Sequence, residues 1–498
     1  MLRTIFSIGF AQVVGLLINT VRAKIFAVLL GPAGFGVVAT IDQLVVSVSQ
    51  FSNLSLPFTA LKFLSRGHSL GEEQFRKSYA AFLQAIAILA VIATLIAIAV
   101  IPRNLANLDP QIAKYRQPVL IALLGIPATM LLVFFGNVLA ARQKTIQSVL
   151  LTRLSSLVLM VFGGIGCLFG GISGIYLVSV PASTALVVGM VIFARVKMNW
   201  PLRDRPAALG RKLKANSEIV ETAISTYIAV CSYSGLLLLA RYQSITHLSE
   251  EAAGLLQAGL ATAMSVGAVL EPTNMLYFAP YVNRAIPAPE KIEVASKFLP
   301  RLIFVYCLGA LPVLLFPELV LRILFSNRFI PAAPLLPWFI AWQCLYQISN
   351  VYQQLLIGLD DLRGYGAVTT LGNLCAAALC ILWTGLFGLI GTAAAFVVGA
   401  IITAGLTVIR LHSRHKLSVP KSMTAIVAFP VLGFALVAAL GHLTTEMTLT
   451  GVGARLLTAV VLLAGLCFVL PKALRFDLVA GMTAGVRALT RWIAPPNS

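Results

Sequence analysis

Charged side chains are scarce in this sequence. They make up 11% of the 498 residues, whereas a soluble domain carries about 25%. Acidic residues are the scarcer sign, with 17 Asp and Glu against 37 Lys and Arg. The longest polar connector, residues 195–218, has roughly the length of one helix. The sequence therefore excludes a folded domain outside the apolar regions.

Motifs of the common nucleotide, metal and hydrolase sites are also missing. The sequence has no Gly-x-x-x-x-Gly-Lys-Ser/Thr phosphate loop, no His-Glu-x-x-His and no Gly-x-Ser-x-Gly. Its seven cysteines form no Cys-x-x-Cys pair, so neither a metal site nor a disulfide framework is indicated. These absences argue against an enzyme and against a cofactor, and they leave Na⁺ or H⁺ open as a coupling ion.

Long apolar runs fill most of the chain, which has a mean hydropathy of +0.93. A membrane span needs about 20 mostly apolar residues. The runs predict an all-α polytopic membrane protein with about 14 transmembrane helices. We place them near residues 4–21, 35–58, 79–101, 118–141, 150–169, 172–194, 219–240, 253–282, 299–325, 333–357, 365–387, 389–410, 423–440 and 454–471.

The net charge of +20 is distributed unevenly over the connectors. If the N-terminus is cytoplasmic, 28 of the 37 Lys and Arg fall on the cytoplasmic side. This asymmetry follows the positive-inside rule. It predicts that both termini are cytoplasmic, and it argues against a nucleic-acid partner.

An internal repeat is indicated at a spacing of 218 residues. Gly36 and Gly254 precede the second and eighth spans, and Arg66 and Arg284 close those spans at the same spacing. An even number of intervening spans gives two parallel, pseudo-symmetric six-helix bundles. The predicted organisation is an N-terminal bundle (1–197), a basic linker (198–218), a C-terminal bundle (219–415), two extra helices (416–472) and an interfacial tail (473–498).

Several ionisable residues lie at or near membrane depth, where they are costly unless they face a cavity or a partner. Arg22, Lys24 and Arg241 are candidates for binding an anionic group, with snorkelling to the interface as the alternative for Arg22 and Lys24. Asp42 could pair with Arg22 or Lys24, or hold a coupling ion. Glu271, beside Pro272, is a second candidate ion site.

Four amides share one face of the predicted tenth span. Gln343, Gln347, Asn350 and Gln354 are separated by four, three and four residues. Amides and nearby aromatic rings suit sugar hydroxyls and sugar faces, whereas hydrogen bonding between helices is the alternative. Four amides exceed what packing needs, so the pattern favours a polar lumen.

Three stretches resemble a known family. Leu30-Gly-Pro-Ala-Gly-Phe-Gly-Val-Val after Arg22-Ala-Lys24 resembles the opening of Wzx-type polysaccharide and O-antigen flippases, in the multidrug/oligosaccharidyl-lipid/polysaccharide exporter superfamily. The stretch 324–329 with 339–343 looks like their ninth and tenth spans, and 388–395 like the start of their twelfth. By position, Arg22, Lys24 and Asp42 match cavity residues of related lipid flippases, and Glu271 stands in the region of a span-eight arginine.

The resemblance implies a flippase of the bacterial inner membrane. Its cargo would be an undecaprenyl-diphosphate-linked oligosaccharide moved from the cytoplasmic to the periplasmic leaflet by alternating access. Its partners would be membrane lipids, a polysaccharide polymerase and a chain-length regulator. The alternatives are a cation-coupled multidrug exporter of the same superfamily, a polyprenyl-glycan polymerase or ligase, and a non-transporting scaffold.

Overall fold

The computed structural model describes residues 2–70, 72–108, 113–142, 144–201, 217–268, 270, 274, 278–282 and 287–417. The regular elements of these residues are all helical, which confirms the predicted all-α polytopic membrane protein. The predicted spans 423–440 and 454–471, the tail 473–498 and most of the 198–218 linker lie outside the described residues.

The described helices fall into two groups separated by the 202–216 connector. The first group contains α1 (Leu2–Ser52), α2 (Leu56–Leu70), α3 (Glu72–Leu108), α5 (Arg116–Leu123), α6 (Ile126–Ala141) and α7 (Thr145–Val196). The second contains α9 (Ser217–His247), α10 (Glu250–Ala268), α12 (Ala279–Val282), α13 (Ala288–Leu315), α14 (Pro317–Leu324), the 3₁₀ helix η2 (Asn327–Leu335), α15 (Leu336–Gly358) and α16 (Leu362–His415). We call these groups the N-lobe and the C-lobe.

Three of the helices are hairpins. Among the described residues, eight helices are long and apolar enough to cross a membrane, and three of them have 40, 51 and 54 residues, about twice the length of one span. Each of the three bends at a glycine with positive φ, namely Gly31 in α1, Gly171 in α7 and Gly388 in α16. Glycine adopts this backbone conformation without a Cβ clash. Each helix therefore supplies two of the predicted spans.

The predicted repeat is visible in the helix bounds. Moving α7 by 218 residues gives 363–414, and α16 runs from 362 to 415. The contacts inside the two hairpins are related by the same spacing. Gly166 contacts Gly174 in α7, and the hydroxyls of Thr384 and Thr392, 218 residues later, lie 2.8 Å apart in α16. The two lobes thus repeat one hairpin in one register.

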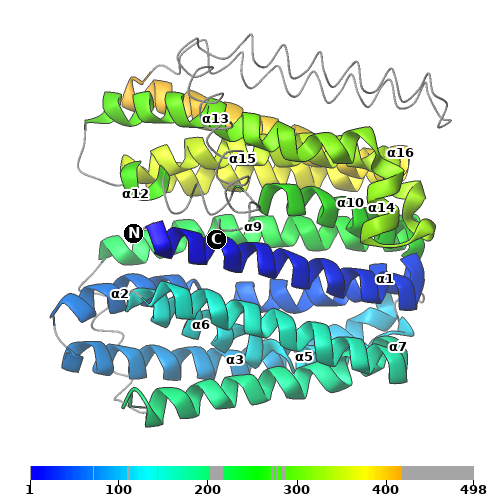
Figure 1. Cartoon of the computed structure of the whole chain (residues 1–498), viewed down its shortest axis with the longest axis horizontal. Helices are drawn as coiled ribbons and strands as arrows, with labels where there is room; N and C mark the ends of the chain where they lie inside the picture. Colours follow the sequence, from blue (N-terminus) through cyan, green and yellow to red (C-terminus); the bar gives the residue numbers. More distant parts are fainter. Residues whose placement is uncertain are drawn as a thin grey trace, which may run out of the picture.

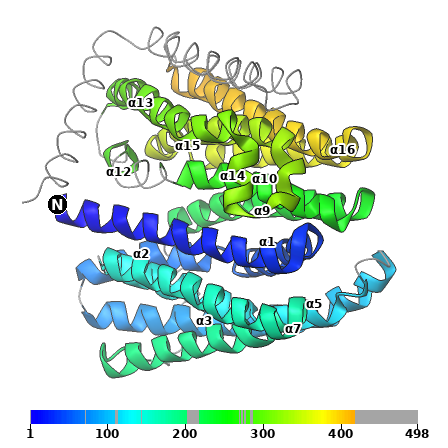
Figure 2. The same cartoon turned by 45° about the vertical axis from the view of Figure 1, so that its right-hand side comes forward.

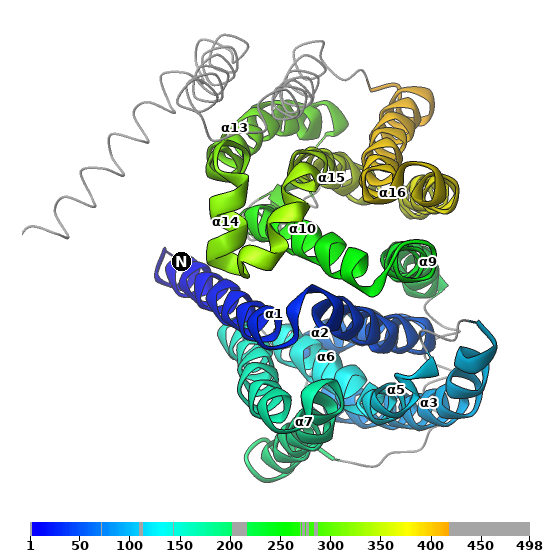
Figure 3. The same cartoon turned by 90° about the vertical axis from the view of Figure 1, so that its right-hand side faces the viewer.

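The two lobes lie side by side with their helices along one shared direction (Figures 1 and 2). Seen end-on, α1 borders α9, α10 and α14, and α2 also faces α9 across this boundary (Figure 3). The bends of α1, α7 and α16 lie at the same end of the molecule, opposite the start of α1 (Figure 1). We call it the bend end, and the other the N-terminal end.

Three predicted spans need correction. The span predicted over 35–58 stops at Ser52, because Leu54 and Ser55 have positive φ and Asn53 accepts a hydrogen bond from the Ser55 N–H. The span predicted over 253–282 is not one helix: α10 ends at Ala268 and α12 begins at Ala279. The span predicted over 299–325 ends at Leu315, because Pro317 disfavours helical backbone at Phe316.

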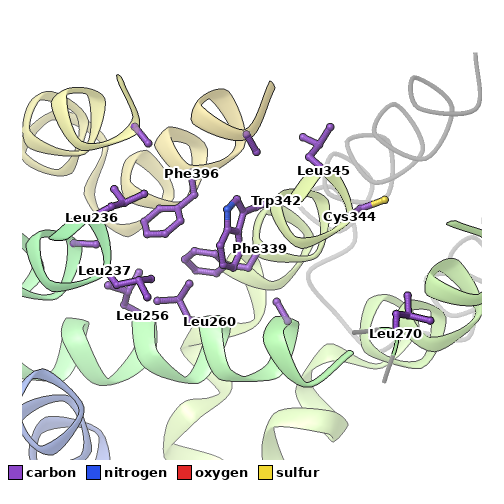
Figure 4. Packing of buried hydrophobic residues seen from close by; sticks show 14 of the residues in the cluster. Leu236, Leu237, Leu256, Leu260, Leu270, Phe339, Trp342, Cys344, Leu345 and Phe396 are labelled. Carbon is purple, nitrogen blue, oxygen red and sulfur yellow. The ribbon is translucent and has the colours of Figure 1, made fainter. Parts of the chain in front are cut away.

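The core of the C-lobe is apolar and partly aromatic. Leu236 and Leu237 of α9 point toward Phe339 and Trp342 of α15 and toward Phe396 of α16 (Figure 4). The Trp342 and Phe396 rings are 5.2 Å apart at their centroids and nearly perpendicular, a favoured geometry for aromatic pairs. This packing holds α9, α15 and α16 together through their apolar side chains.

At the N-terminal end, each lobe has a cluster of charged and polar side chains that connects its helices. In the N-lobe the Arg142 guanidinium lies 4.5 Å from the Phe75 ring centroid and 5.4 Å from that of Trp200, and it pairs with Glu72. In the C-lobe Asp361 caps α16 by accepting from the Gly364 N–H, and it pairs bidentately with Arg410 at 2.8 and 2.9 Å. Trp200, in the predicted linker, is buried in this N-lobe cluster.

Candidate functional site

An ion pair joins the two limbs of the α1 hairpin. Arg22 on the first limb pairs with Asp42 on the second, and the Tyr176 hydroxyl of α7 donates to the other Asp42 oxygen at 3.0 Å. The pairing of Asp42 with Arg22 was one of the two predicted alternatives. The Arg22 and Asp42 side chains are 24% and 36% exposed, so the pair is only partly buried.

Lys24 and Arg241 have different surroundings from Arg22. The Lys24 ammonium donates to the Ile323 carbonyl at 2.6 Å, in the last turn of α14, where a cation complements the helix dipole. Arg241 is buried and donates to the Gln257 side chain at 3.1 and 2.5 Å and to the Leu237 carbonyl at 2.8 Å. The three predicted cationic residues therefore have three separate sets of partners.

The second limb of α1 forms the boundary between the lobes. Ser47 lies 2.9 Å from the Ser234 hydroxyl of α9, and the Gln43 amide donates to the same hydroxyl at 3.1 Å. Closer to the bend end, a Cβ on Gly254 would lie 1.9 Å from the Pro32 carbonyl oxygen. The repeat-related Gly36 and Gly254 thus meet at the boundary, where backbone lies against backbone.

The four predicted amides do not share one environment. Gln343 and Gln347 are buried against α10, where the Gln347 amide donates to the Gly267 carbonyl at 3.4 Å. Asn350 lines a polar pocket instead. Gln354 is half-buried and is not part of the pocket lining.

The polar pocket has a volume of about 280 Å³. Its walls come from α9, α15 and α16 of the C-lobe, with Gln50 of α1 contributed by the N-lobe. The polar groups are neutral amides and hydroxyls, supplied by Gln50, Ser349, Asn350, Gln353, Thr369, Asn373 and Thr403 together with Tyr233, Tyr346 and Tyr365. This lining can donate and accept hydrogen bonds without attracting either sign of charge.

Aromatic rings form one side of this pocket. The Tyr233 and Tyr346 rings are stacked, with centroids 5.8 Å apart, and Trp342 lies 6.0 Å from Tyr346. Hydrogen bonds hold two of the polar lining residues: Gln353 bonds to Thr369 at 3.0 Å, and Asn373 bonds to Ser232 at 2.9 Å. The pocket therefore combines flat apolar faces with fixed polar groups.

Some residues of these sites escaped the sequence analysis. Arg153 of α7 was not a candidate, and its guanidinium lies against Gly15 of α1. Tyr176, Gln50 and Asn373 carry no motif, and only the helix packing brings them to the site. Glu271 lies outside the described residues. Among the residues that the structure describes, no cluster of three or more His, Cys, Asp or Glu could hold a metal ion.

Comparison with known proteins identifies the fold. Neither a protein-family model nor a curated protein matches this sequence. Among solved structures, the lipid II flippase MurJ in an inward closed conformation has 13% identity and a TM-score of 0.69, covering 95% of this chain and 99% of its own.

Two other solved structures share the fold over most of their length. An inward-facing multidrug resistance MATE family transporter of the MOP superfamily has 15% identity and a TM-score of 0.64, covering 81% of this chain and 96% of its own. The MATE multidrug transporter DinF-BH has 16% identity and a TM-score of 0.59, covering 83% of this chain and 96% of its own. The TM-scores over most of each chain establish a common fold.

Proposed function

We propose that this protein is a flippase of the bacterial inner membrane. In this proposal it moves an undecaprenyl-diphosphate-linked oligosaccharide from the cytoplasmic to the periplasmic leaflet, with both termini cytoplasmic. The two lobes rock against each other and expose the boundary alternately to each side. The fold shared with MurJ and MATE transporters supports a transport mechanism of this kind.

The observation that carries the choice of cargo is the neutral polar pocket. Neutral amides and hydroxyls beside stacked tyrosines suit sugar hydroxyls and sugar faces, and none of the pocket-lining residues is acidic or basic. Because Gln50 belongs to the N-lobe and the other walls to the C-lobe, rocking changes the size and access of the pocket. A glycan would therefore be bound in one arrangement of the lobes and released in another.

The Arg22–Asp42 pair suits the diphosphate. A diphosphate arriving at the partly exposed pair competes with Asp42 for the guanidinium, since arginine binds phosphate and carboxylate through the same fork of donors. Asp42 would keep its hydrogen bond from Tyr176 and become free to take up H⁺ or Na⁺. An inside-negative membrane potential adds about 2.3 kcal/mol per charge per 100 mV in favour of outward movement of the anion.

A multidrug exporter is the main alternative. Export of cationic drugs calls for unpaired carboxylates in the binding region. Asp42 is paired with Arg22, and the polar pocket has no carboxylate among its described lining residues. The charge pattern therefore favours an anionic, glycan-bearing cargo.

Deletion and complementation test this function. A strain without the protein should accumulate the lipid-linked oligosaccharide and lose surface polysaccharide while its drug resistance stays unchanged. Asn350→Ala should fail to restore polysaccharide, whereas Gln354→Ala, on the same helix but outside the pocket, should restore it. Raised drug sensitivity with normal polysaccharide would instead identify a multidrug exporter.

A second comparison isolates the role of Arg22. If the guanidinium binds diphosphate, Arg22→Gln abolishes binding of the lipid-linked glycan to the purified protein. Asp42→Asn should then leave binding intact or strengthen it, because it removes the competing carboxylate. Equal loss of binding in both variants would show that the pair only holds the α1 hairpin together.

A further inference from the structure

A second, apolar pocket lies between the lobes in the half of the molecule next to the bend end. Its volume is about 530 Å³. One side is formed by α1, α3 and α5 of the N-lobe, for example by Ile41 and Val119, and the other side by Leu238 and Leu239 of α9. The lining is hydrocarbon apart from a few side chains, among them Asn104, Tyr115 and Tyr242.

This pocket is suited to a hydrocarbon chain. An apolar cavity does not hold water, and an empty one loses the packing contacts of its lining. Val100, which lines the pocket on α3, is 49% exposed, so this part of the pocket wall is not covered by other side chains. Gly235 on α9 widens it, since a Cβ there would meet only the Phe51 ring, at 3.8 Å.

Basic residues flank the polar rim of the pocket. Arg103 is adjacent to Asn104 in the chain, and Lys114 and Arg116 are on either side of Tyr115; all three are exposed. Among the described residues, Glu250 of α10 pairs with Lys114 at 2.7 Å and accepts from the Tyr115 hydroxyl at 2.8 Å. The charge excess at the rim is therefore positive, and it complements a phosphate.

We propose that this pocket binds an anionic phospholipid of the surrounding bilayer, with one acyl chain between α1, α3 and α9 and the phosphate among Arg103, Lys114 and Arg116. Because the walls belong to both lobes, the bound lipid joins them at the bend end and favours the arrangement in which that end is closed. The site is independent of the cargo proposed above. Its occupant is a bilayer component rather than the transported molecule.

The test uses the purified full-length protein and two phospholipids with identical chains, phosphatidylglycerol and phosphatidylcholine. Native mass spectrometry should show about tenfold tighter retention of phosphatidylglycerol, as expected for a few basic groups near one phosphate. Gly235→Phe fills the pocket and should reduce the retention of both lipids, because both place an acyl chain there. The control is Gly405→Phe in the same lobe, where no atom lies within 4 Å of an added Cβ, and retention should be unchanged.

A second pair of variants covers the case in which Gly235→Phe does not fold. Val100→Phe narrows the pocket from the N-lobe, and Val91→Phe, on the same helix, exposed and outside the pocket, is its control. Lys114→Ala should remove most of the preference for phosphatidylglycerol. Equal retention of the two lipids by the wild type, or unchanged retention in both pocket variants, would overturn the proposal. Recovery of a lipid-linked glycan instead of phospholipid would overturn it too, because the pocket would then be a cargo site.

Discussion

The contact between Gly36 and Gly254 gives the sharpest prediction. A Cβ added at Gly254 would lie 1.9 Å from the Pro32 carbonyl oxygen, whereas ordinary contact begins at 3.4 Å. Both lobes present backbone at this point, so no change of rotamer relieves the clash. Gly254→Ala therefore requires the lobes to separate by about 1.5 Å at the bend end, the difference between those two distances.

The energetic size of this change follows from packing. Overfilling a close-packed contact costs about 1–3 kcal/mol, which exceeds the gain of about 1 kcal/mol from replacing a helical glycine by alanine over most of that range. A change of 1–3 kcal/mol shifts a two-state equilibrium by about 5- to 150-fold. Gly254→Ala should shift the protein by up to this factor toward the arrangement in which the bend end is open.

Double electron–electron resonance measures the distance between two spin labels and so reports how far the lobes separate. Phe169 and Phe387 are suitable sites, because they are 89% and 63% exposed and lie at the bends of α7 and α16 in opposite lobes. In a background with serine in place of each cysteine, Gly254→Ala should lengthen the distance between the labels. Gly405→Ala, where nothing lies within 4 Å, should leave it unchanged. An identical distance distribution in Gly254→Ala and the parent would refute the reasoning.

Two further predictions concern stability at the N-terminal end. Burial raises the pKa of Asp361, but its hydrogen bonds to basic partners and to a backbone N–H outweigh this and lower the pKa from 3.8 to about 2. The lowered pKa contributes about 2 kcal/mol to stability; this contribution is present above pH 4 and is lost as the pH falls toward 2. Asp361→Asn should remove it in thermal unfolding at pH 7, whereas Asp360→Asn, at an exposed neighbour, should not. Arg142→Gln should lower the free energy of unfolding by about 1–3 kcal/mol, because it removes the cation from the aromatic cluster. The control, Arg76→Gln, removes the exposed partner of the same Glu72 and should cost less than 1 kcal/mol. Equal losses in the two variants would contradict the role of the aromatic contact.

The sequence predicted the helices better than their ends. Hydrophobic runs are long and continuous, so the spans that fall on described residues all coincide with helical segments. The breaks depend on single residues: the positive φ values at Leu54 and Ser55 end α1, and Pro317 separates α13 from α14. Hydropathy averages over such positions. It therefore extended the second and ninth spans beyond the observed ends of their helices.

Pairwise predictions succeeded where a turn fixes the geometry. Arg22 and Asp42 are almost equally far from Gly31, so a hairpin at that glycine brings them together. The amides of α15 lacked such a constraint, because a shared helix face says nothing about which neighbours cover it. That face meets α10 at Gln343 and Gln347 and the polar pocket at Asn350. The predicted glycan role of these amides and the cationic roles of Lys24 and Arg241 stay predictions.

The repeat explains why a glycine pair occurs at the boundary. Two positions related by a pseudo-twofold axis can touch each other only where they lie close to that axis, and Gly36 and Gly254 are both related by the 218-residue spacing and in contact. Because both are glycines, the lobes meet there backbone to backbone, with little apolar surface to bury. A contact of that kind is inexpensive to break. Neighbouring interactions also hold the closed end. Phe35 of α1 packs against Phe325 and Phe329 of the C-lobe, with ring centroids 5.7 and 5.6 Å apart. The Lys24–Ile323 hydrogen bond and the Lys114–Glu250 pair add polar contacts, which water can replace when the lobes separate. Reversible opening is thus consistent with both the sequence repeat and the chemistry of the boundary.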